Sequence, residues 1–138
     1  MKERKGYIKA QSIPLKSGIK GGTQVNISYQ GLITLGSGLI DKLGIDNLED
    51  SWSVQLYSTL HNTDLTIDII NEVGKHNWRK GGKVNCKPML RDIPLDWIQE
   101  IINQEEDKDG KVKVSSITCN DTTLSTDGEI VIDVKEPK

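Results

Sequence analysis

The amino-acid sequence predicts an α+β fold dominated by β-strands: a twisted, mostly antiparallel sheet, or a small sandwich-like or barrel-like sheet, with one packed α-helix. Isoleucine is the commonest apolar residue with 17 copies, whereas alanine occurs once, at Ala10, and phenylalanine is missing. β-branched side chains fit pleated, half-buried surfaces, and scarce alanine argues against a helical bundle. Several segments also alternate apolar and polar residues with a period of two, which is typical of strands that bury one face.

The first predicted strand covers residues 25–35, where apolar residues occupy the odd positions and polar residues most of the even ones. Gly31 lies within this run and indicates a bulge or a bend. The glycines that follow end the strand. A short helical turn is expected over 39–43, with Ser37 as its cap and Gly44 as its stop.

Residues 52–70 predict a β-hairpin, because two alternating runs flank the turn-forming sequence at 61–64. A further strand is expected over 83–89. Two more are expected over 112–118 and 129–134, with a polar link at 120–128 between them.

One helix is predicted, from Pro94 to about Glu105. Proline suits the first turn of a helix, and Asp92 is a candidate cap. The helical spacing of four apolar residues gives it one buried stripe, formed by Trp97, Ile98, Ile101 and Ile102.

The chain of 138 residues predicts a single domain, 1–138, with a basic N-terminal arm at about 1–20. The basic start lacks a following apolar region, so no signal peptide is expected. The uncharged run 21–40 is too polar and too rich in glycine to predict a membrane span. Cys86 and Cys119 are expected as reduced thiols in a cytoplasmic setting.

The charges are sorted into blocks along the chain. Residues 73–91 hold six basic residues and no acidic one, whereas 41–72 hold seven acidic residues and one basic one, and 92–138 hold twelve and five. The formal net charge of −2 therefore hides a strongly polarised chain. Such polarity usually bears on what a protein contacts.

No motif predicts a cofactor or a metal. Gly36-Ser37-Gly38 lacks the third glycine of a dinucleotide fingerprint, and Gly81-Gly82-Lys83 lacks the first glycine and the hydroxyl residue of a P-loop, so both are expected as turns. The run 105–110 resembles the first half of a calcium loop, but position 12 is Ser116 rather than glutamate.

The soft metal ligands have no typical spacing; they are His61, His76, Cys86 and Cys119. No nucleophile elbow is present. The sequence therefore predicts no cofactor, no metal and no enzymatic activity.

The basic block is the strongest contact signal. Its candidate interaction residues are Lys75, Trp78, Arg79, Lys80, Lys83, Lys87 and Arg91. Cations neutralise phosphates or acidic surfaces, and an aromatic ring stacks on a base or anchors an interface. The alternative is a solvated loop and strand, with Trp78 packed in the core.

The leading hypothesis is a non-catalytic structural or interaction protein, a subunit of a larger assembly that contacts a protein partner or its own copies through complementary charged faces. Lysine-rich, alanine-poor composition is typical of low-GC genomes, so a phage or virion component, or a cytoplasmic protein, fits. One alternative is a small nucleic-acid-binding module that uses 75–91 and the basic arm. Another is an oligomer that sequesters a ligand. No membrane partner is expected.

Overall fold

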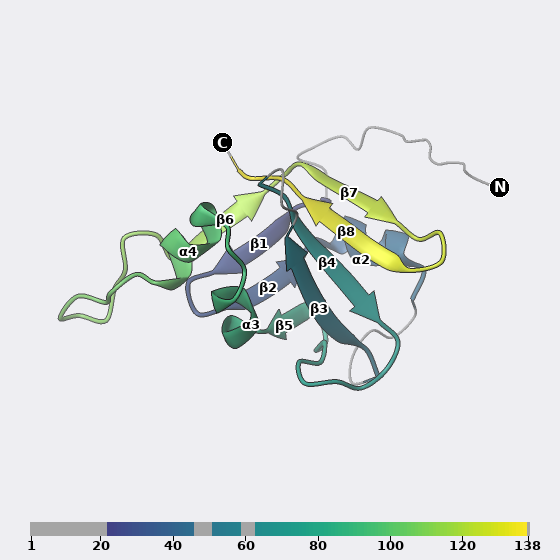
Figure 1. The fold of residues 1–138 in the computed structure, drawn as a ribbon, viewed down its shortest axis with the longest axis horizontal. Coiled ribbons are helices and arrows are strands. Elements are labelled where there is room, and N and C mark those ends of the chain that lie inside the picture. Colours follow the sequence, from purple (N-terminus) through teal and green to yellow (C-terminus); the bar gives the residue numbers. More distant parts are fainter. Residues whose placement is uncertain (1–21, 46–50, 59–62, 138) are drawn as a thin grey trace.

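The computed structural model describes residues 22–45, 51–58 and 63–137. Its architecture is built on two four-stranded antiparallel sheets (Figure 1). The β1 sheet has the order β5-β2-β1-β6 and contains β1 (Val25–Ser28), β2 (Leu32–Leu35), β5 (Lys83–Asn85) and β6 (Ser116–Cys119). The β4 sheet has the order β3-β4-β8-β7 and contains β3 (Ser53–Ser58), β4 (Leu65–Ile70), β7 (Thr122–Ser125) and β8 (Ile130–Val134). The predicted β-dominated α+β fold is confirmed.

The inward-facing side chains of both sheets belong to one buried cluster. The β1 sheet contributes Val25, Ile27, Ile33 and Leu35, and the β4 sheet contributes Val54, Leu56, Ile67 and Ile132. The alternation seen in the sequence is therefore the alternation between this core and the outer faces.

The predicted strand 25–35 is wrong as a single strand, because it is the hairpin β1–β2. Val25 pairs with Leu35 and Ile27 with Ile33 across a three-residue turn. Gly31 has φ 89°, and its N–H donates to the Ser28 carbonyl at 3.0 Å. The turn returns the chain without changing which parity faces the core, so the alternation continues through it.

The hairpin predicted over 52–70 is confirmed as β3–β4, in which Val54 pairs with Ile69 and Leu56 with Ile67. Half of its predicted turn, 61–62, lies outside the described residues, as does Leu60. The predicted basic arm at 1–20 also lies outside them.

The strand predicted over 83–89 ends at Asn85, and α3 (Lys87–Arg91) follows it. Pro88 lies in the first turn of this helix. Proline cannot donate to a strand ladder but suits a first helical turn, which explains the correction.

The predicted helix is shorter than expected and runs over α4 (Asp96–Ile102). Asp92 is not its cap: it ends α3, and Leu95 precedes the first turn of α4. The apolar stripe is confirmed, since all four of its residues are buried.

The helical turn predicted over 39–43 is the short helix α2 (Ser37–Leu43), and α3 is a further short helix that the sequence did not predict. Ser37 lies inside α2 and Gly36 occupies the cap position, whereas Gly44 ends the helix with φ 72° as expected.

The polar link predicted at 120–128 contains β7, an edge strand with the sequence TTLS. The alternation is weak there, since Leu124 is its one apolar residue. The strand predicted over 112–118 is reduced to β6, and β8 confirms the strand predicted over 129–134.

No helix of the described residues has the length and apolar character needed to cross a bilayer.

Candidate basic interaction surface

The basic block closes one side of the sandwich. Its chain folds back along the edge of β3, where the N–H of Val54 donates to the His76 carbonyl at 3.1 Å and the N–H of Trp78 donates to the Trp52 carbonyl at 2.9 Å. The chain then turns and joins the other sheet as β5, beside β2. The block therefore bridges an edge of each sheet, and that rigid attachment positions its side chains.

Asn77 fixes the loop that carries Lys75 and His76. Its Oδ1 accepts a hydrogen bond from the Gly74 N–H, and its Nδ2 donates to the Gly74 carbonyl, both at 2.8 Å. A side chain that satisfies both backbone groups of one residue holds the intervening loop in one conformation. Sequence reasoning did not identify Asn77; its only signal is its spacing from Gly74.

Trp78 is not part of the exposed surface. It is fully buried, and its Nε1 donates to the Ser53 carbonyl at 3.0 Å. Trp78 directly follows Asn77, the bridge partner of Ser53, and its ring packs into the core. The expectation that Trp78 offers an aromatic face to a partner is therefore corrected, and the alternative of core packing holds.

Residues 79–83 form the hairpin turn predicted at Gly81-Gly82. Arg79 and Lys83 are cross-strand partners, and the Arg79 N–H donates to the Lys83 carbonyl at 2.7 Å. Gly81 and Gly82 have φ 85° and 72°, which glycine adopts without strain. The turn places two positive charges directly opposite each other, an arrangement that destabilises an antiparallel pair.

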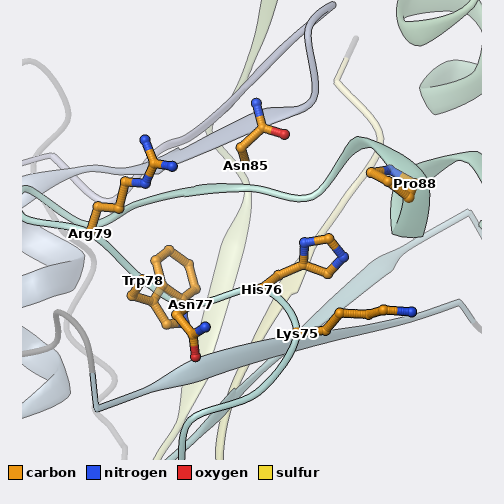
Figure 2. Close-up of a pocket in the computed structure, with 7 residues that line it drawn as sticks. All are labelled: Lys75, His76, Asn77, Trp78, Arg79, Asn85 and Pro88. Carbon is orange, nitrogen blue, oxygen red and sulfur yellow. The ribbon is translucent and has the colours of Figure 1, made fainter.

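A hollow of about 520 Å³ opens within this block (Figure 2). It is lined by Lys75, His76, Asn77, Trp78, Arg79, Asn85 and Pro88. Figure 2 shows Arg79 and Lys75 toward opposite ends, with His76 and Asn85 between them. The fully buried Trp78 forms part of the wall without presenting a free face. The lining therefore combines two cations with imidazole and amide donors, which suits an anionic group.

The structure brings some of the predicted residues together and separates others. Lys75 and Arg79 line the hollow, Lys83 faces Arg79, and Lys80 lies in the adjoining turn. Lys87 and Arg91 instead begin and end α3. All but the half-buried Lys87 are exposed. Within the described residues, none of the six cations forms an ion pair or a side-chain hydrogen bond.

The glycine-rich segment 36–38 and the calcium-like loop 105–110 use their polar groups in hydrogen bonds to the backbone. The N–H groups of Gly36 and Gly38 donate to the carbonyls of Gln24 and Gly22 at 2.8 and 3.0 Å, and Ser37 and Gly38 begin α2, so the turn expected at 36–38 is instead the start of that helix. In the loop resembling a calcium site, Asp107 Oδ1 accepts hydrogen bonds from the N–H groups of Asp109 and Lys111 at 2.8 and 2.9 Å.

The two cysteines are free and buried, as expected for reduced thiols. Burial raises the pKa of Cys86 to about 12 and that of Cys119 to about 11, so both thiols are protonated at neutral pH. Among the described residues, no group of three or more histidine, cysteine or carboxylate side chains is arranged to hold a metal. His61 lies outside them.

A second hollow of about 860 Å³ lies where β4 begins and β8 ends. It is lined by Thr63, Asp64, Thr118, Asn120, Asp121, Lys135, Glu136 and Pro137. Its carboxylates are accompanied by the cation of Lys135, so its charge is mixed. The first hollow, whose charged lining is all of one sign, is the candidate site.

Comparison of the chain with known proteins finds no matching family model, no matching curated protein and no matching solved structure.

Proposed function

We propose that this protein is a non-catalytic interaction protein, a subunit of a larger assembly, that binds an acidic protein surface through its exposed basic surface. The observation that supports the proposal most strongly is the pair Arg79–Lys83, two cations opposite each other across a hairpin, neither of which forms an ion pair with a described residue. Like charges facing each other cost stability. A carboxylate bound between them relieves this repulsion, and the relief adds to the free energy of binding.

A protein partner is favoured over nucleic acid because the surface lacks an exposed aromatic ring. Modules that bind single strands combine cations with aromatic rings on which bases stack. Here Trp78 is buried, and the hollow has no other aromatic lining except the imidazole of His76. The acidic charge carried by the rest of the chain would also repel a polyanion that extends beyond the hollow.

A titration of the full chain with a polyglutamate peptide tests the proposal. We expect binding at low salt that weakens steeply as salt rises, and that is lost in R79Q/K83Q. The matched control K108Q/K111Q removes the same charge from an exposed loop and should bind as the wild type does.

Absence of polyglutamate binding, or equal losses in both variants, overturns the proposal. Tighter binding of a single-stranded oligonucleotide than of polyglutamate would favour a nucleic-acid-binding module. Thermal stabilisation by a nucleotide, without polyglutamate binding, would favour ligand sequestration. The same proposal includes a location in the cytoplasm or, for a phage protein, in the virion.

A further inference from the structure

The outer face of the β4 sheet carries charge opposite in sign to the basic surface. Its strands contain Asp68 and Asp133 but no lysine or arginine, and Glu129 directly precedes β8. The register aligns its outward residues in two rows across the strands: Gln55, Asp68, Val131 and Ser125, and Tyr57, Thr66, Asp133 and Thr123. Lys135 directly follows β8 with the same parity, so the acidic end of this partly apolar face is the end that holds Asp68 and Glu129.

No described helix crosses this face (Figure 1). The Tyr57 side chain is 51% exposed there. The other exposed large hydrophobic residues of the described chain are Val73 and Val114, so Tyr57 is the one exposed large aromatic ring among them. An aromatic residue beside charged groups is a typical anchor of a protein interface.

Two carboxylates on this face lie near each other without a cation. The pKa of Asp68 is raised, first by partial burial and then by the negative charge of Glu129. Among the described residues, neither carboxylate forms an ion pair. This is the acidic counterpart of the unpaired cations at Arg79 and Lys83.

The basic and acidic groups lie on opposite sides of the sandwich. Lys83 and Asn85 alternate with the buried Val84, so they point away from the core on the β1 sheet. Asp68 alternates with the buried Ile67 and Ile69, so it points away from the core on the β4 sheet. One copy of the chain cannot bring the two groups together, whereas two copies can.

We propose that the acidic partner of the basic surface is a second copy of this chain, bound through the outer face of its β4 sheet. The inference rests on the proposed function and names its partner. The contact is heterologous, because different surfaces of the two copies meet. Each bound copy keeps one free basic surface or one free acidic face, so the assembly grows head to tail into a ring or a filament.

The size of the face predicts how tightly the copies bind. Four strands about 4.8 Å apart, with about 3.4 Å per residue, give a face of roughly 400 Å². A standard interface buries about 800 Å² on each partner. We therefore expect weak association that depends on concentration and falls with salt.

The test uses light scattering on two variants of the full chain at low salt. R79Q/K83Q keeps the acidic face but loses the basic pair, and D68N/E129Q keeps the basic surface but loses the acidic pair. Each variant alone should remain monomeric. As concentration rises, the mass of an equimolar mixture should approach twice that of one chain and go no higher, because only one basic surface and one acidic face remain in each pair.

The controls K108Q/K111Q and E105Q/D109N remove the same charges from the exposed loop after α4 and should assemble as the wild type does. Circular dichroism of each variant verifies its fold, and the single variants K83Q and E129Q replace any double variant that does not fold.

A monomeric wild type at low salt and high concentration overturns the inference, as does a mixture that stays monomeric while the wild type assembles. Self-association of either variant alone also overturns it. If the wild type stays monomeric while polyglutamate still binds at Arg79 and Lys83, the proposed function stands and only the second copy is rejected. If polyglutamate binding is absent as well, both fail.

Discussion

Removal of one charge from the Arg79–Lys83 pair should have opposite effects on stability and binding. The two residues face each other across the hairpin and are exposed. Cross-strand side chains have Cβ atoms about 4.5–5.5 Å apart, and charges at the ends of long side chains can spread further. Two unit charges about 5–8 Å apart in water repel by about 0.5–0.8 kcal/mol.

Arg79→Gln should therefore raise the free energy of unfolding by about 0.5 kcal/mol at low salt, within the range of roughly 0.2–1 kcal/mol for cross-strand pairs. For a small protein with a urea m-value of about 1–3 kcal/mol/M, the midpoint of urea unfolding should rise by about 0.2–0.5 M. The gain should disappear at about 1 M salt, where the screening length falls to about 3 Å. The same variant should bind polyglutamate more weakly than the wild type.

Lys108→Gln is the control, because Lys108 lies in a loop among acidic residues and its removal relieves no repulsion. A midpoint for Arg79→Gln that falls, or that rises equally at low and high salt, would refute the reasoning. It would mean that the Arg79 side chain acts through packing and not through charge.

Three further predictions follow from the same contacts. Asn77→Ala should lower the free energy of unfolding by about 1–3 kcal/mol, because it removes two hydrogen bonds to the loop backbone, and Asn77→Asp, which keeps the acceptor, should lose less in urea unfolding. Cys86 and Cys119 should resist a thiol reagent in the native state at about pH 8 and react only in denaturant, since burial raises both pKa values; rapid native labelling would contradict their burial. Asp68→Asn should raise the melting temperature at neutral pH. The folded pKa of Asp68 lies above its unfolded value, so its ionised carboxylate costs stability at pH values above the folded pKa. The difference in melting temperature between Asp68→Asn and the wild type should therefore shrink as pH falls through the aspartate range. A difference that grows in acid would contradict this.

The sequence predicts the fold class because alternation depends on local residues that face one core. Val54 and Leu56 alternate toward that core, and their hairpin follows directly. The β1–β2 hairpin is hidden because its turn keeps the same parity on both sides. Helix α3 has five residues, and β7 one apolar residue, so neither shows a readable period.

The candidate site depends on which segments pair in space, which the alternation along the sequence does not show. The charge blocks identify the basic segment, but not that Arg79 faces Lys83 or that Trp78 turns into the core. The proximity of Asp68 to Glu129 comes from the pairing of β4 with β8, strands far apart in the chain. Such long-range pairings come from three-dimensional packing, and local propensity carries no information about them.

The molar mass of the wild-type chain in solution, measured by light scattering at two ionic strengths, tests the central claim most directly. At about 0.01 M salt, where the screening length is about 30 Å, we expect a mass above the 15.4 kDa of one chain that rises with protein concentration. At about 1 M salt, where it is about 3 Å, the mass should return to 15.4 kDa. A mass of 15.4 kDa under both conditions, or an assembly that salt does not affect, would contradict assembly of copies through complementary charged faces.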